Sequence, residues 1–184
     1  MPDLVIRIKK KSDGSAALSC TRADGSVTWQ RQDGKLGLFF PLHDLTHYAV
    51  ETTLGFSRAF YGLLADGWDI SDFGKPEHKG VDLPEAGLTE LIVGFFDLER
   101  ATGHLIDATD VNEKIATYYL SKHQHRPDFQ IDQNQVDRIR TLRSELFTRW
   151  NDLPAGETLA LEFKRAPKFS VDTRPRDTKP RART

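Results

Sequence analysis

The sequence predicts an α+β fold in which an antiparallel sheet packs against about four helices. Three Asp-Gly pairs divide the first forty residues into short runs of β-forming residues, which is typical of consecutive β-hairpins. From residue 41 to residue 153, apolar side chains recur instead at helical spacing. An alternating segment at 158–163 then predicts one late strand. We therefore expect about four N-terminal strands, one late strand and a disordered basic C-terminal tail.

The N-terminal strands are expected between the glycine-containing turns. Each Asp-Gly pair supplies a glycine, which adopts the positive φ of a tight turn without steric cost. The expected strands cover 4–8, 16–21, 27–30 and 36–40. The late strand is expected to join the same sheet, although the sequence does not identify its neighbour.

The central segment is expected to be helical. Pro41 suits the first turn of a helix, and Gly67 is a plausible end of the same helix. The stretch 68–83 is rich in Gly, Pro and Asp, which indicates a loop. Three further helices are expected at 84–102, 107–123 and 132–153.

Composition and charge limit the class of protein. The 184 residues are 38% hydrophobic and 29% charged, as in a globular domain, and contain no apolar run long enough to cross a membrane. We expect one domain at 1–164 and a tail at 165–184. The lone Cys20 excludes an intramolecular disulfide and is expected to be a small core residue in a cytoplasmic protein.

The net charge of −1 hides an uneven distribution. Residues 164–184 carry eight Lys or Arg against two Asp, and residues 1–163 carry the remaining 18 basic and 25 acidic side chains. A basic tail on an acidic body predicts contact with nucleic acid or an acidic protein, or else a solvated terminus without a partner.

The most specific chemical signal is the segment from Pro41 to Glu51. His43, His47 and Glu51 are spaced four residues apart, so that on a helix they form one polar stripe. Imidazole and carboxylate groups are ligands for Zn, Mn or Fe. We therefore predict that these three residues are metal ligands and that Asp44, beside the first histidine, is a catalytic carboxylate that orients water.

This pattern resembles the His-Glu-x-x-His motif of zinc metallopeptidases, in which a Glu between two zinc-binding histidines acts as a general base. The resemblance covers about five residues. Asp44 stands where that Glu belongs, and its shorter side chain does not support the peptidase activity.

The geometry of a straight helix also limits the ligand set. Eight residues span about 12 Å of helix, so His43 and Glu51 cannot easily share one ion, whereas neighbouring pairs can. Further ligands would come from the loop that follows the helix. It offers Asp66, Asp69, Asp72, Glu77 and His78.

Two main functions stay open at this stage, beside a third, an accessory protein that contacts nucleic acid through the basic tail. The first is a metal-dependent protein with hydrolytic activity, built on the helix that starts near Pro41. The second is a non-catalytic protein-interaction domain, in which His43, His47 and Glu51 form a structural hydrogen-bond network and the basic tail contacts an acidic partner.

Overall fold

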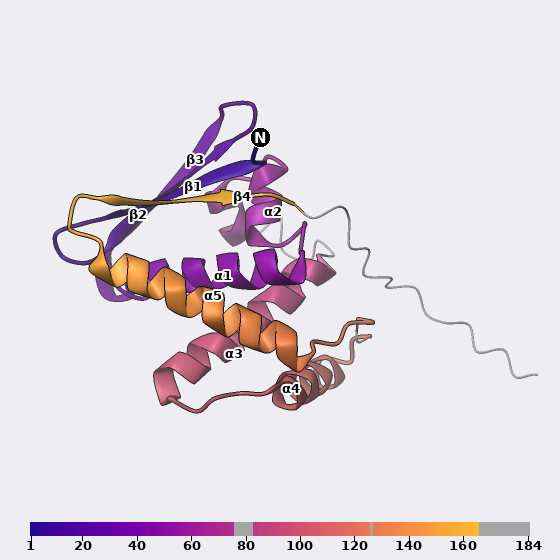
Figure 1. The fold of residues 1–184 in the computed structure, drawn as a ribbon. Helices are drawn as coiled ribbons and strands as arrows, with labels where there is room; N and C mark the ends of the chain where they lie inside the picture. The colour runs from indigo at the N-terminus through magenta and orange to yellow at the C-terminus, as the bar shows by residue number, and fades with distance from the viewer. Residues whose placement is uncertain (76–82, 126, 166–184) are drawn as a thin grey trace, which may run out of the picture.

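The computed structural model describes residues 1–75, 83–125 and 127–165. Four strands form one antiparallel sheet in the order β3-β2-β1-β4 (Figure 1). They are β1 (Leu4–Lys10), β2 (Ala16–Arg22), β3 (Val27–Gln32) and β4 (Thr158–Phe163). The late strand pairs antiparallel with β1, with Ile6 opposite Leu161. The chain therefore returns to its first strand after the helices of the described residues.

Five α-helices and two short 3₁₀ helices make up the remaining elements of the described residues. The α-helices are α1 (Phe40–Leu54), α2 (Phe60–Ala65), α3 (Pro84–Thr102), α4 (Ala108–Ser121) and α5 (Gln133–Asp152). The 3₁₀ helices are η1 (Gly34–Leu36) and η2 (Ile70–Gly74). None of these helices is long and apolar enough to span a lipid bilayer.

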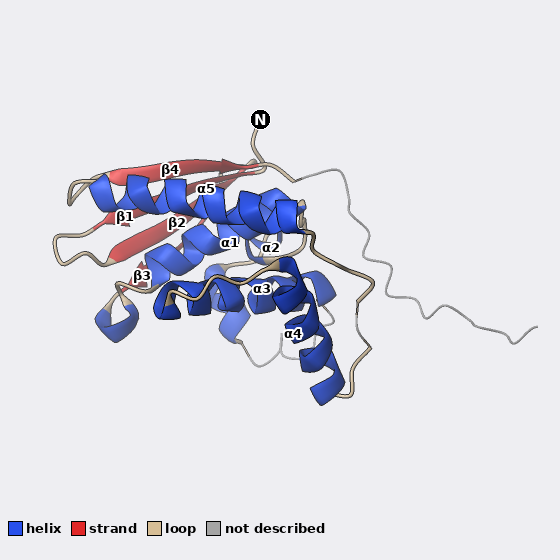
Figure 2. Ribbon diagram, turned by 60° about the horizontal axis from the view of Figure 1, so that its bottom comes forward, coloured by secondary structure: helices blue, strands red, loops and turns tan. Residues whose placement is uncertain are grey.

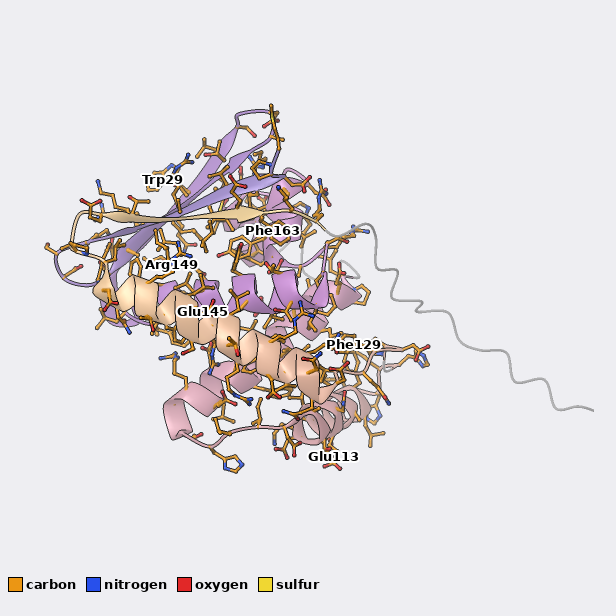
Figure 3. The ribbon with its side chains drawn as sticks, in the orientation of Figure 1. Trp29, Glu113, Phe129, Glu145, Arg149 and Phe163 are labelled. Atoms are coloured by element: carbon orange, nitrogen blue, oxygen red, sulfur yellow. The ribbon has the colours of Figure 1, made fainter. Side chains whose placement is uncertain are left out.

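The helices lie on one side of the sheet. Figure 2 shows α1 and α5 beneath the strands, with α3 and α4 farther away. Side chains alternate along β1, so that Leu4, Ile6 and Ile8 are buried towards the helices. Phe163 of β4 lies between the sheet and the helices (Figure 3). Cys20 is also buried in this core, as expected, and burial raises the pKa of its thiol to about 12.

The predicted fold class is confirmed, but the fourth N-terminal strand is wrong. Residues 36–40 end η1, form a turn and enter α1. Leu36 and Leu38 are exposed, so the apolar run does not bury a sheet face. Gly37 lies so close to the chain that a Cβ atom there would meet the carbonyl oxygen of Gln32 at 2.8 Å. This close approach turns the chain out of β3.

The helix expected from Pro41 to Gly67 is two helices. Gly55 ends α1 in the left-handed conformation, with φ 71°, and its N–H donates to the carbonyl of Glu51. The chain then turns, and α2 begins at Phe60. A Cβ atom at Gly62 would lie 2.1 Å from the carbonyl oxygen of Ser57, so this turn requires glycine there. The predicted tail lies almost wholly outside the described residues.

Candidate metal centre

The candidate site lies where α1 packs against α3. Nδ1 of His43 is 2.7 Å from Oδ2 of Asp97, and Nε2 of His47 is 3.4 Å from Oε1 of Glu90. The later histidine on α1 therefore faces the earlier acid on α3, so the two helices run in opposite directions here. Each histidine of the predicted stripe is matched by a carboxylate of the other helix.

His43 is held by its contacts on both sides. Its Nδ1 shares the hydrogen bond with Asp97, and its ring stacks on Phe39 at a centroid distance of 5.1 Å. Burial lowers the pKa of His43, but the hydrogen bond and the charge of Asp97 outweigh it and raise that pKa above its ordinary value. A proton between Nδ1 and Asp97 leaves Nε2 as the nitrogen that can bind a ligand.

His47 is almost completely buried, and burial lowers its pKa to about 4. The imidazole is therefore neutral at pH 7, and its approaches to carboxylates are not ion pairs. Its Nδ1 is 3.4 Å from Oε1 of Glu51, yet neither atom has a hydrogen-bond partner. A small rotation of either group would join them, and with Nδ1 as the donor the Nε2 lone pair faces Glu90.

Glu51 connects this histidine with the start of α2. Its Oε2 accepts hydrogen bonds from the N–H groups of Tyr61, at 3.0 Å, and Gly62, at 3.4 Å. These are N–H groups in the first turn of α2, which have no partner within the helix. Burial raises the pKa of Glu51 well above its ordinary value. One oxygen of the carboxyl group thus accepts hydrogen bonds from the start of α2, and the other lies beside His47.

Three potential ligands converge at this place. His43, His47 and Glu90 each offer one donor atom, and these atoms lie within 4.8 Å of one another. Ligands of a tetrahedral zinc ion are about 3.3 Å apart, since zinc–nitrogen bonds are about 2.0–2.1 Å long. The side chain of Glu90 is 59% exposed and can supply the closing movement. The group therefore could hold a divalent metal ion.

Asp44 lies beside the group and is buried. Its Oδ2 accepts a hydrogen bond from Nε2 of Gln32, on β3. Burial raises the pKa of Asp44 to about 7, against the hydrogen bond from Gln32, which favours the charged form. Near neutral pH this carboxyl group can therefore either accept or donate a proton.

The group opens into a pocket of about 580 Å³. Its polar floor includes His43, Asp44, His47 and Glu90. Its other walls come from β3, the first residue of α1, the start of α2 and η2. Trp29 borders the pocket at the sheet edge, but alternation with the buried Thr28 places its side chain on the other face of the sheet (Figure 3).

The structure brings together His43, His47 and Asp44 of the predicted site. Glu51 contacts His47 but is not part of the three-donor group, in which the carboxylate is Glu90. Sequence reasoning missed both Glu90 and Asp97. They are seven residues apart, which places them on one face of the predicted helix 84–102. That spacing was the available signal.

The loop acids proposed as further ligands have other partners. The ion pairs are Asp66 with Arg165, Asp69 with Arg22, and Asp72 with Lys75. Glu77 and His78 lie outside the described residues. Among the described residues, the carboxylates nearest to the histidines therefore come from α1 and α3.

Comparisons with known proteins identified no similar protein. No protein-family model matches the sequence, and searches of curated proteins and of solved structures found no match either.

Proposed function

We propose that this protein binds a divalent transition-metal ion, Zn, Mn or Fe, through His43, His47 and Glu90, and uses it for hydrolysis in the adjoining pocket. The observation that carries the proposal is the convergence of two imidazoles and one carboxylate within 4.8 Å. Two histidines and one carboxylate leave coordination positions open for water and substrate, as catalytic sites require.

The groups behind the histidines support this assignment. Metal-binding histidines usually donate their second N–H to a carboxylate or carbonyl, which fixes the ring and its tautomer. Asp97 lies 2.7 Å from Nδ1 of His43, and Glu51 lies 3.4 Å from Nδ1 of His47. Each ring thus has a carboxyl group beside its Nδ1, and Nε2 is the nitrogen proposed to bind the metal. In this proposal Glu51, predicted as a ligand, orients His47 instead.

Asp44 supplies the proton chemistry in this proposal. A divalent metal ion held here would lower the pKa of a bound water, to about 7 in the case of zinc. Asp44 lines the same pocket, and its pKa of about 7 suits a group that accepts a proton from water and passes it on. The hydrogen bond from Gln32 fixes the position of the carboxyl group.

Metal analysis of the full chain tests the proposal. The protein is purified without a histidine tag, stripped with EDTA, titrated with Zn²⁺ in a calorimeter and analysed for bound metal. We expect one zinc ion per chain. The variant Glu90→Gln is the most informative, because this exposed side chain can change without unfolding the protein. It should weaken zinc binding more than the roughly 10- to 100-fold that loss of an outer partner costs.

Matched controls separate the site from general surface binding. Glu113→Gln makes the same change at an exposed position on α4, labelled in Figure 3. His104→Ala removes an exposed histidine and is compared with His43→Ala. Both control variants should bind zinc as the parent protein does. If the parent binds no zinc above the level of Glu90→Gln, the proposal is wrong.

The second candidate function is a non-catalytic interaction domain with a structural polar network. One observation favours it: Glu51 ties α1 to α2 through a buried contact and Asp97 ties α1 to α3 through a partly buried one, which would hold the helices together without any ion. The acidic partner of the basic tail belongs to this alternative. It requires that His43→Ala lowers stability while zinc remains unbound in the parent protein.

A further inference from the structure

Aromatic rings extend from the candidate metal ligands along the wall of the pocket. The His47 ring lies 5.3 Å from the ring of Phe60, which lies 5.0 Å from the ring of Phe73. Phe40 lines the same pocket at the start of α1. Phe73 also contacts the ring of Trp68 at 5.5 Å, and the residue is 39% exposed, so part of it faces solvent. An apolar, flat group would cover these rings and stabilise the complex by leaving water.

The charges around the pocket exclude anionic ligands. No Lys or Arg occurs among the described residues that line it, whereas Asp44 and Glu90 do. The ammonium group of Lys75, beside the lining residue Gly74, is bonded to Asp72. A phosphate or carboxylate entering here would face Asp44 and Glu90. The one described lining residue that can become cationic near neutral pH, His43, is already paired with Asp97. The remaining polar lining, such as Gln30 and Ser71, is uncharged.

A bound metal ion would also disfavour cationic ligands. The ion contributes two positive charges, whereas Glu90 offsets one and Asp44, with a pKa of about 7, offsets only part of the other, so an ammonium group would meet like charge. The volume of about 580 Å³ lies in the range of pockets for small molecules. An uncharged ligand of modest size therefore suits both the aromatic walls and the charged groups around the proposed metal ion.

We infer that the pocket takes an uncharged amide or ester with an aromatic group close to its carbonyl. The ring lies against Phe60 and Phe73, and the carbonyl faces His43, His47 and Glu90. The carbonyl part of this inference rests on the proposed function. The preference for an uncharged aromatic compound over an anionic one rests on the walls alone and holds in the metal-free protein.

A series of naphthalene derivatives tests the inference, because its members share one ring system and differ in charge. Dissociation constants for 2-naphthamide, 2-naphthoate and 2-naphthyl phosphate are measured by ligand-observed NMR on the EDTA-treated full chain. The amide should bind at least tenfold more tightly than either anion. Equal or tighter binding of an anion would overturn the inference. The anions are compared in metal-free protein, since they would coordinate zinc directly.

The cationic member is tested in the zinc-loaded protein. There, 2-naphthylmethylamine should bind at least tenfold more weakly than 2-naphthamide. Equal or tighter binding of the amine would show a site for ammonium groups and would reject the preference for uncharged compounds.

Two variants locate the bound ring. Phe73→Ala should weaken binding of 2-naphthamide about tenfold in metal-free protein. Tyr118→Ala, which removes an aromatic side chain of the same 39% exposure from α4, should leave it unchanged. Equal effects of the two variants would place the compound elsewhere and overturn the inference. Failure of the zinc titration with intact selectivity in this series would reject only the proposed function and the carbonyl orientation.

Discussion

Two buried clusters of charged and polar residues lie on α3, and they differ in how completely their atoms are paired. In the first, Glu99 accepts hydrogen bonds from Arg140, Arg143 and the N–H of Ile106. In the second, the candidate site, the two fully buried acids, Asp44 and Glu51 of α1, have no arginine or lysine among their bonded partners. The first cluster joins α3 to α5, and the second joins α3 to α1.

The pKa values follow this difference. Burial opposes the charge of Glu99, but the bonds from Arg140 and from Ile106 outweigh it and lower the pKa of Glu99. In the candidate site, burial raises the pKa of both Asp44 and Glu51. The cost of burying a charged carboxylate is thus offset by hydrogen bonds and cations in the Glu99 cluster but not in the candidate site.

Unpaired buried atoms show the same contrast. Among the described side chains, the buried nitrogen and oxygen atoms without a hydrogen bond are Gln32 Oε1, His47 Nδ1, Glu51 Oε1 and Arg100 Nε. Three belong to the candidate site, and Arg100 contacts Asp97 beside it. None belongs to the Glu99 cluster. A saturated ion network stabilises a fold, whereas an unsaturated one is typical of a site that binds something.

The largest effect on stability is expected in the saturated cluster. Glu99→Ala leaves Arg143 buried without its counterion, and loss of one partner of a buried pair costs about 3–5 kcal/mol. Urea denaturation should show this loss in the free energy of unfolding. The control Asp137→Ala removes an exposed partner of Arg140 and should cost less than about 1 kcal/mol. Equal losses in both variants would contradict the distinction between the two clusters.

The next effect is opposite pH dependence of the two clusters. Asp44 has an ordinary pKa of 3.8 and a folded pKa of about 7, so between these values the folded chain binds more protons than the unfolded chain. Stability relative to Asp44→Asn should therefore fall as pH rises from about 4 to 7, by on the order of a few kcal/mol. Urea denaturation of metal-free protein across this range measures the difference.

Glu99 supplies the opposite sign. Its folded pKa is below the ordinary value of 4.5, so its stabilisation is present above that value and is lost as pH falls through the folded pKa. Stability relative to Glu99→Gln should therefore fall on acidification. Parallel pH curves for the parent, Asp44→Asn and Glu99→Gln would show that neither group is perturbed as argued.

A smaller effect on stability, with a larger effect on metal binding, is expected at Glu51. Glu51→Gln keeps an oxygen that can accept from Tyr61 and Gly62, so the free energy of unfolding should change by less than about 1 kcal/mol. Zinc affinity should fall roughly 10- to 100-fold, since the carboxylate no longer orients His47. Calorimetry and urea denaturation measure the two quantities.

The variant Glu51→Ala sharpens this test. It leaves the buried N–H groups of Tyr61 and Gly62 without an acceptor and should cost about 1–3 kcal/mol more than Glu51→Gln. If Glu51→Gln binds zinc as tightly as the parent protein does, Glu51 does not orient His47.

Local patterns in the sequence were sufficient for most of the fold. Asp-Gly turns located three hairpin strands, and alternation located β4, because both signals are local. The acids Asp107 and Asp132 cap α4 and α5 through capping boxes that begin where the helical pattern begins. The strand at 36–40 was wrong because an apolar run shows which residues avoid water only on average. Here the chain forms η1 and a tight approach at Gly37 directly after β3, and the apolar residues around it do not pair with a strand.

Only the part of the candidate site that lies on a single helix, α1, was predicted. His43 and His47 are on one helix, so their spacing alone placed them on one face. Glu90 and Asp97 approach them from α3, and the register between two helices is not encoded in the spacing of either one. An acidic pair seven residues apart is also common on solvated helices, and sequence alone could not distinguish this one.

The smallest effect on stability is expected at Glu90. This acid approaches His47 at 3.4 Å, but its side chain is 59% exposed and His47 is neutral at pH 7, so no ion pair is lost when it is neutralised. Glu90→Gln should change the free energy of unfolding of metal-free protein by less than about 0.5 kcal/mol. In the presence of zinc, the parent should gain stability in proportion to the logarithm of the zinc concentration, and the variant should gain much less. A variant that zinc stabilises as strongly as the parent would leave the two histidines without their proposed third ligand and would place the ion elsewhere.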